Sequence, residues 1–371
     1  MKLNYHTYRE IHQQPVVWKK AYDIIRARKA EIAAFLDANA GPDTQIVLTG
    51  AGTSAYIGDA LAPALFRCAR TVCAIATTDI ITHAASYFDS ESKVLLVSFA
   101  RSGNSPESVG AVKAVEKTAG KVSHIFITCN EKGELARMEG DNILTVLLPP
   151  ETNDQSLAMT SSYSTMLLVC SLILQIRHIE EEEKYIDALA AGVQQALDKY
   201  EESIKALADI DFHRAVFLGS GPLKGVAEES RLKLQELTDG GVMCAFDSFL
   251  GFRHGPKAVV NADSIIVYLI SPDPQVKPYE RDLIQQIEKQ HYAKAYVGIG
   301  QREEDLSGYH FDVAVNLGLP EGMPDYYSCV AYVVVAQLLG LFKSIQCGLS
   351  PDAPSVSGNI SRVVEGVTLY L

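Results

Sequence analysis

The sequence of 371 residues contains no Cys-x-x-Cys pair, and its seven cysteines are an odd number. Structural zinc sites need closely spaced cysteines, and the disulfide frameworks of small secreted domains need cysteines that can pair. Most of these cysteines stand instead in apolar stretches, as Cys170 does after residues 167–169. The pattern is typical of reduced, buried thiols, so we expect a cytoplasmic protein without a metal site.

Basic clusters and long apolar segments are also missing. Lys and Arg number 33 against 45 Asp and Glu, a net charge of −12, and no basic run occurs. This excludes general binding to nucleic acids or anionic membranes, but not a small anionic substrate in a locally positive pocket. The first residues have no signal-type apolar segment, and the apolar runs near 167–176 and 330–342 look too short or too polar to cross a bilayer.

What the sequence does contain is a repeated pattern within an ordinary globular composition, 47% hydrophobic and 21% charged. At roughly 150 residues per domain, the length corresponds to two or three globular units. A short apolar run, a Gly-x-Gly turn and an amphipathic helix occur at residues 46–65 and again at 215–237. This is half of a βαβ unit, so the repeat predicts two copies of one α/β fold.

The segments between and after these repeats alternate in the way that parallel sheets covered by helices require. Further strands are predicted at 72–77, 94–99, 124–128, 143–148, 264–270, 294–299 and 313–317, and helices at 106–118 and about 279–290.

Four segments divide the chain. We expect an N-terminal helical segment at 1–42, a first domain at 43–185, a second domain at 186–350 and a tail at 351–371. The boundary between the domains is placed at the acidic stretch 180–184 or in the helix after it. No low-complexity linker follows this stretch, so the two domains should be rigidly associated.

Neither Gly-x-Gly turn has the third glycine of the dinucleotide fingerprint, because the next glycines are Gly58 and Gly225. Asp79 could still mimic the acid that binds an adenosine ribose, so a nicotinamide enzyme stays a minor alternative. The first turn offers hydroxyl groups, Thr53 and Ser54, where a helix begins. Free amides and hydroxyls at a helix N-terminus favour a phosphate group.

A second cluster of hydroxyl groups follows the predicted strand 94–99. Ser105 before Pro106 is a helix N-cap, but capping requires Ser105 alone. Ser102, Gly103 and Asn104 add donors and a permissive backbone at the carboxyl end of a parallel strand, where ligands of open α/β sheets bind. The two clusters together predict a phosphate held without lysine, metal or organic cofactor.

The second half of the chain carries titratable groups. Glu229, Lys233 and Glu236 follow the i, i+4, i+7 spacing and so share one face of a helix. They form either a surface ladder of salt bridges or part of a site. His254 stands in a tight turn before Gly255-Pro256, a position typical of functional loops.

Taken jointly, these segments resemble the sugar isomerase (SIS) superfamily. The sequence from 232–237 through 253–256 is similar to the isomerase half of glucosamine-6-phosphate synthase. Over nearly its whole length the chain resembles the AgaS-type deaminases/isomerases of galactosamine 6-phosphate and tagatose 6-phosphate. The motifs that carry this second resemblance are 48–55, 101–107, 158–162, 251–257, 357–359 and 362–364.

The resemblance implies two tandem SIS domains, each a flavodoxin-like or Rossmann-like parallel sheet between helices. It implies conversion of galactosamine 6-phosphate to tagatose 6-phosphate and ammonia, with no cofactor. In the synthase pattern the groups around the substrate phosphate correspond to Thr53, Ser54, Ser102 and Ser105.

The remaining roles fall mostly on the second half. Glu236 corresponds to the carboxylate that moves a proton between C2 and C1, and Glu229 and Lys233 to its polar neighbours. His254 corresponds to the group that opens the sugar ring from the neighbouring subunit, which implies a homodimer with shared active sites. Arg362 stands where the synthase has a C-terminal catalytic lysine.

Some positions depart from the synthase. Ala100 and Arg101 replace a serine and a glutamine of its phosphate loop, and Ser161 replaces a lysine near the sugar. The synthase's glutamine-hydrolysing domain has no counterpart in the sequence, so the resemblance favours deamination. Glucosamine-6-phosphate deaminase, a simple aldose–ketose phosphosugar isomerase and a non-catalytic phosphosugar-binding module stay open as alternatives.

Overall fold

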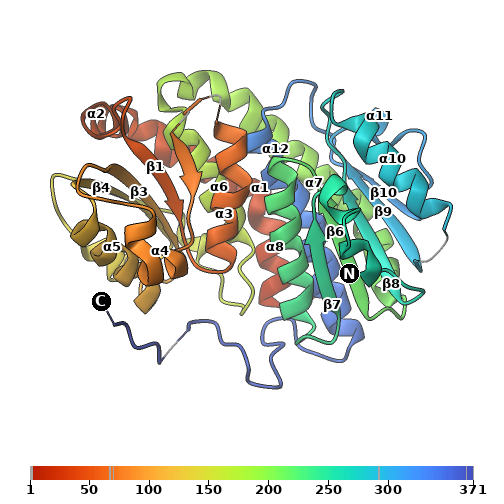
Figure 1. Ribbon diagram of the computed structural model, residues 1–371. Helices are drawn as coiled ribbons and strands as arrows, with labels where there is room; N and C mark the ends of the chain where they lie inside the picture. The colour runs from red at the N-terminus through yellow and green to blue at the C-terminus, as the bar shows by residue number, and fades with distance from the viewer. Residues whose placement is uncertain (1–2, 67, 70, 291–292, 365, 371) are drawn as a thin grey trace.

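The computed structural model describes residues 3–66, 68–69, 71–290, 293–364 and 366–370. In these residues the chain forms two five-stranded sheets on opposite sides of a central layer of helices (Figure 1). The first sheet contains, in spatial order, β2 (Val72–Ala74), β1 (Gln45–Thr49), β3 (Lys93–Ala100), β4 (Lys121–Thr128) and β5 (Ile143–Leu147). The second contains β7 (Met243–Asp247), β6 (Arg214–Gly219), β8 (Ser264–Leu269), β9 (Ala295–Gly300) and β10 (Val313–Asn316).

Both sheets have the same topology. Counted along the chain within each half, the spatial order is 2-1-3-4-5, and all the strand pairs are parallel. This is the flavodoxin-like order of doubly wound folds, which bind ligands in the crevice between the first and third strands. The prediction of two tandem copies of one α/β fold is confirmed.

Twelve α-helices cover the sheets and fill the space between them. They are α1 (His6–Ala27), α2 (Lys29–Asn39), α3 (Thr53–Leu65), α4 (Thr77–His83), α5 (Pro106–Thr118), α6 (Ser161–Leu174), α7 (Ile179–Asp209), α8 (Pro222–Leu237), α9 (Phe249–Phe252), α10 (Lys277–Glu288), α11 (Glu303–Leu306) and α12 (Asp325–Gln346). The count refers to the described part of the chain. In the central layer α3 packs on α8, α8 on α12, and α1 on α6, α7 and α12.

The two halves share one hydrophobic core. A single cluster of buried side chains includes Leu48 of β1 and Phe217 of β6, and it also takes in Trp18 of α1. The N-terminal helices therefore pack against elements of both halves. Residue 185, the predicted end of the first domain, falls inside α7, which joins the two sheets as one 31-residue helix.

Most predicted elements are present, and one strand was missed. The predicted helix 106–118 coincides with α5, whereas the predicted strand 72–77 ends at Ala74 because α4 begins at Thr77. The sequence analysis did not predict β7. This edge strand has no β-branched residue, and its Met243 is 64% exposed, so it lacks the apolar pattern of the central strands.

The longest apolar segment proved longer than the sequence suggested. α12 has 22 residues and a mean hydropathy of 1.7 over its most apolar 18, which would suffice to cross a membrane. That segment is 94% buried inside the protein, as expected for a core helix. α6 and the segment Ile176–Asp209 would together also be long and apolar enough to cross a membrane, but they are bent by 82° at the break between them.

Candidate active site

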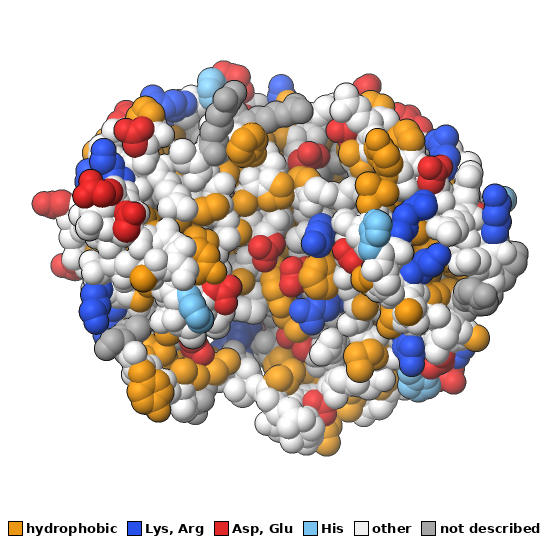
Figure 2. Space-filling view, viewed as in Figure 1, with side chains coloured by type: hydrophobic (Ala, Val, Ile, Leu, Met, Phe, Trp, Pro, Cys, Tyr) orange, Lys and Arg blue, Asp and Glu red, His pale blue; other side chains and the backbone are white. Residues whose placement is uncertain are grey.

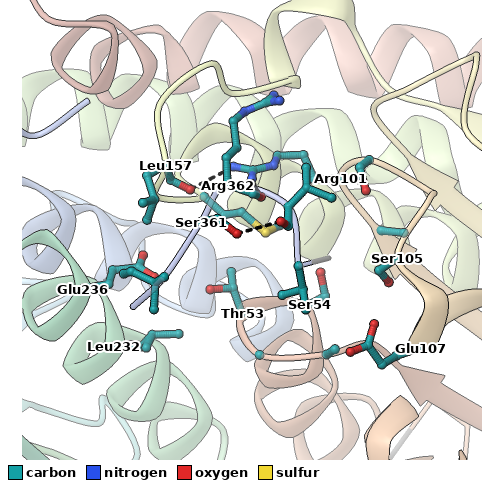
Figure 3. Close-up of a pocket in the computed structure, with 18 of the residues that line it drawn as sticks. Thr53, Ser54, Arg101, Ser105, Glu107, Leu157, Leu232, Glu236, Ser361 and Arg362 are labelled. Carbon is teal, nitrogen blue, oxygen red and sulfur yellow. Dashed lines mark hydrogen bonds between the residues drawn. The ribbon is translucent and has the colours of Figure 1, made fainter. Parts of the chain in front are cut away.

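A cavity of about 700 Å³ lies at the carboxyl ends of β1 and β3 (Figure 3). Five segments line it: the turn after β1, the end of β3 with the loop after it, residues 157–159, the end of α8 with the turn after it, and the C-terminal tail. The polar lining residues are Thr53, Ser54, Arg101, Ser102, Ser105, Glu107, Ser108, Gln235, Glu236, Asp239, Asn359, Ser361 and Arg362. Figure 2 shows side chains of both charge signs scattered over this face, whose surface is hollowed below its centre.

The turn after β1 presents Thr53 and Ser54 to the cavity. Gly52 adopts a φ of 55°, which favours glycine, and a Cβ at Gly50 would lie 2.5 Å from the backbone of Ser54. Both glycines are therefore needed for the chain to turn directly from β1 into α3. As a result, Thr53 and Ser54 both line the cavity at the N-terminus of α3.

The loop after β3 brings a second pair of hydroxyl groups to the same cavity. Ser105 caps α5, because its Oγ accepts the N–H of Ser108 at 3.2 Å, as the sequence predicts. Ser102 also lines the cavity, and its Oγ accepts the N–H of Asn104 at 3.3 Å. Gly103 and Asn104 do not line it: Gly103 turns the chain with a φ of 67°, and Asn104 accepts the N–H of Glu134 at 2.9 Å.

The side chains of Glu229, Lys233 and Glu236 form a charged cluster on α8. Glu229 and Lys233 are fully buried, and the Lys233 Nζ lies 3.2 Å from a carboxylate oxygen of Glu229 and in contact with the carboxylate of Glu236. The alternative of a surface ladder is therefore wrong. Of the three, Glu236 lines the cavity, and its side chain is 14% exposed.

Burial governs the proton affinities in this cluster. Burial, together with the charge of Glu236, raises the pKa of Glu229 to about 8, although Lys233 opposes the shift. Burial alone would lower the pKa of Lys233, but the two carboxylates raise it above its usual value. Lys233 thus stays positively charged beside the Glu236 carboxylate at neutral pH.

One hydrogen bond joins this cluster to the hydroxyl-lined turn. The Nζ of Lys233 donates to the Oγ1 of Thr53 at 3.1 Å, across the interface between α3 and α8. The site therefore combines a turn from the first half of the chain with a helix from the second half. A molecule that reached Ser54 or Ser105 with one end would lie beside Glu236 with the other (Figure 3).

The C-terminal tail covers part of the cavity and is fastened at several points. The Nε of Arg362 donates to the carbonyl of Asp154 at 2.9 Å, and its guanidinium points away from Glu236 (Figure 3). Earlier in the tail, Ser357 is bound by Asp239, just after α8, at 2.7 Å between its Oγ and the carboxylate. Asp352 accepts the backbone N–H groups of His6 and Thr7, at 2.9 and 2.8 Å, and so caps the first turn of α1.

His254 lies outside this cavity. It is exposed, in the turn after α9, and its backbone N–H donates to the carbonyl of Gly251 at 2.9 Å. Within one chain the structure therefore brings together the predicted hydroxyl groups, Glu236 and Arg362, but leaves His254 apart from them. In the residues described, no group of three or more His, Cys, Asp or Glu side chains could hold a metal ion.

The SIS-domain family model matches residues 42–176, which contain the whole first sheet. The D-galactosamine-6-phosphate deaminase AgaS of Shewanella sp. (strain ANA-3) is 38% identical over 98% of this chain and 91% of its own. The enzyme of the same name from Escherichia coli O157:H7 is 35% identical over 98% of this chain and 95% of its own. The chain belongs to the AgaS family of SIS-domain proteins.

A known crystal structure has the same overall fold as this chain. The crystal structure of tagatose-6-phosphate ketose/aldose isomerase from Escherichia coli superposes with a TM-score of 0.89 at 32% identity, covering 99% of this chain and 97% of that one. The duplicated sheets of the present AgaS-family chain are therefore matched in full by a solved structure.

The sequence analysis missed three charged residues of this AgaS-family cavity, Arg101, Glu107 and Asp239. Arg101 is 6% exposed and donates to the carbonyls of Leu157, at 3.2 Å, and of Arg362. Burial lowers the pKa of Arg101, and the charge of Arg362 lowers it further. Glu107, in the first turn of α5, also lines the cavity. Arg101 was noted only as a departure from the synthase, because its contacts lie far away in the sequence.

Proposed function

We propose that this protein is a galactosamine-6-phosphate deaminase that forms tagatose 6-phosphate and ammonia. The observation that carries the proposal is the cavity in which four hydroxyl groups and two helix N-termini lie opposite the Glu236 carboxylate. The names of the AgaS relatives, which share 35–38% of their residues with this chain over nearly its full length, support the same substrate.

The phosphate group is proposed to lie between the turn after β1 and the loop after β3. Thr53, Ser54, Ser102 and Ser105 would donate hydroxyl hydrogen bonds to it, and the N-termini of α3 and α5 would add amides and favourable dipoles. Arg101, which also lines the cavity, would add positive charge near the phosphate dianion. Binding at C6 would hold C1 and C2 of the sugar against Glu236.

Glu236 is proposed as the base of the reaction. In the open-chain aldehyde it would take the proton from C2 while O1 takes a proton from water, which leaves an enolamine, and it would then return a proton to C1. The product is an imine at C2, which water hydrolyses to the ketose phosphate and ammonia. Lys233, in contact with Glu236 and Glu229, would hold the carboxylate of Glu236 in its orientation, so Glu229 acts as a positioning residue through Lys233.

Ring opening needs a group that moves a proton between O1 and the ring oxygen, and His254 is proposed for it. An imidazole side chain can both give and take a proton, which this step needs, and His254 is exposed outside the cavity. We therefore propose a homodimer in which His254 of each chain completes the cavity of the other. Arg362 would hold residues 359–364 of the tail over the substrate, since its guanidinium is bound at Asp154.

A second candidate is simple aldose–ketose isomerisation of a phosphosugar, which the name of the Escherichia coli structure favours. The deciding experiment compares kcat/KM for galactosamine 6-phosphate, glucosamine 6-phosphate and tagatose 6-phosphate, with ammonia and ketose measured separately. Ammonia release from galactosamine 6-phosphate supports the proposal. Interconversion of tagatose 6-phosphate with its aldose, without any ammonia from the amino sugars, would favour the isomerase, and no turnover would favour a binding module. We propose a cytoplasmic location for the enzyme.

A further inference from the structure

The second sheet offers a ligand the same position as the first, between its first and third strands. In the first domain the crevice between β1 and β3 opens into the cavity, and the corresponding crevice of the second domain lies between β6 and β8. The two Gly-x-Gly turns have nearly the same backbone, with φ and ψ of 55° and −129° at Gly52 and of 55° and −125° at Gly221. Each turn leads into a long helix, so the two crevices are alike in backbone and differ in the side chains around them.

A side-chain carboxylate occupies the crevice of the second domain. Glu280 of α10 is fully buried, and its Oε2 accepts the backbone N–H of Ser271 at 3.0 Å. Ser271 follows β8 almost directly, as Arg101 follows β3. Burial raises the pKa of Glu280 to about 7, against hydrogen bonds from Ser220 and Ser271 that lower it. Ser220 is the middle residue of the second Gly-x-Gly turn, so the carboxylate lies beside both segments that form the crevice and is hydrogen-bonded to the backbone of Ser271.

The first domain has no acid at the matching position. α5 and α10 both follow the third strand of their sheet, and counted from the first residue of each helix, Glu280 corresponds to Val109. Val109 is 6% exposed and packs in an apolar cluster behind the loop after β3. An apolar side chain cannot hydrogen-bond to that loop, which leaves its amides and hydroxyl groups to an external anion.

We propose that the crevice between β6 and β8 is a second anion site that the carboxylate of Glu280 fills from within. Removal of that carboxylate would open the site to a small carboxylate or phosphate ion. The intact chain would therefore bind one phosphosugar and not two. This inference depends on the geometry of the second domain alone and holds whichever sugar phosphate the first cavity accepts.

Replacement of Glu280 by alanine removes the atoms that acetate contains, so acetate is the matched probe. Acetate at about ten times its dissociation constant should raise the Tm of Glu280→Ala by about 2 °C relative to the same concentration of chloride. The Tm of the wild type should not respond. Glu280→Gln keeps the shape and a hydrogen-bond acceptor for Ser271, so it should be insensitive to acetate as well.

Leu283→Ala is the control for general destabilisation, because Leu283 is fully buried on the same helix but contacts an apolar cluster. It should lower the Tm without any response to acetate. If Glu280→Ala does not fold in chloride, its refolding yield in acetate is compared with its refolding yield in chloride, and the same two yields are measured for Leu283→Ala. Equal effects of acetate on Glu280→Ala and Leu283→Ala would overturn the proposal. So would two phosphate ions bound per wild-type chain in equilibrium dialysis.

Discussion

The buried carboxyl of Glu229 should make the stability of this protein fall as the pH rises. Burial raises its pKa from 4.5 to about 8, so between these values the folded protein holds a proton that the unfolded chain has released. The unfolded state then binds fewer protons than the folded state, and the free energy of unfolding decreases with pH. The decrease begins near pH 4.5 and ends near pH 8, where the folded state is ionised too.

The size of this decrease in unfolding free energy follows from the pKa shift of Glu229. One pKa unit corresponds to about 1.4 kcal/mol, so the contribution of Glu229 should change by roughly 3–4 kcal/mol between pH 5 and pH 8. Glu229→Gln has no proton to lose, and it keeps the shape of the side chain next to Lys233. Lys233 does not titrate in this range, because its pKa is raised from 10.5.

Urea unfolding of the wild type and Glu229→Gln at pH 5, 6, 7 and 8 tests the reasoning. The difference in unfolding free energy between the two proteins should shift in favour of Glu229→Gln by that amount across the series. Glu202→Gln, an exposed position on α7, is the matched control and should follow the wild type at every pH. If the curves of wild type and Glu229→Gln run parallel, the carboxyl of Glu229 is not protonated in the folded protein.

Three further outcomes are expected from the proposed site. Glu236→Gln should lower kcat by about 10²–10⁴-fold with little change in KM, as steady-state kinetics would show, because the amide cannot accept a proton; more than a tenth of the wild-type kcat would contradict its role as base. Mixing Glu236→Gln with His254→Asn chains should restore about a quarter of the wild-type activity after subunit exchange, since half of the dimers are then mixed and one of their two sites is intact; no recovery after verified exchange would place the site in one chain. Ser102→Ala should weaken phosphosugar binding by about 1–3 kcal/mol by calorimetry, whereas Ser105→Ala should also cost about 1 kcal/mol of stability as the lost N-cap; unchanged affinity in Ser102→Ala would refute the phosphate position.

The local parts of the site could be predicted from the sequence, because they depend on neighbouring residues. The Gly-x-Gly turn and the capped start of α5 bring Thr53 and Ser105 to strand ends, and the order of parallel strands brings these ends together. The shared face of Glu229 and Lys233 followed from helical spacing in the same way.

Burial and long-range contacts could not be predicted. The spacing of Lys233 does not reveal that α3 and α12 pack over it: a Cβ at Gly340 of α12 would lie 3.1 Å from the carbonyl oxygen of Lys233. Arg101 was missed for a related reason, since it binds a carbonyl 261 positions further along the chain. β7 was missed because the alternation of apolar residues that marks a half-buried strand is weak at an exposed sheet edge.

The cap that Asp352 places on α1 links the two ends of the chain thermodynamically. Asp352 binds the backbone N–H groups of His6 and Thr7, and the tail that it begins continues to residues 359–364 at the cavity. A ligand that orders the tail therefore also favours the state in which Asp352 is hydrogen-bonded to the first turn of α1. The amides of His6 and Thr7, which do not line the cavity, should then exchange hydrogen more slowly when a phosphosugar is bound, and they would serve as remote reporters of occupancy.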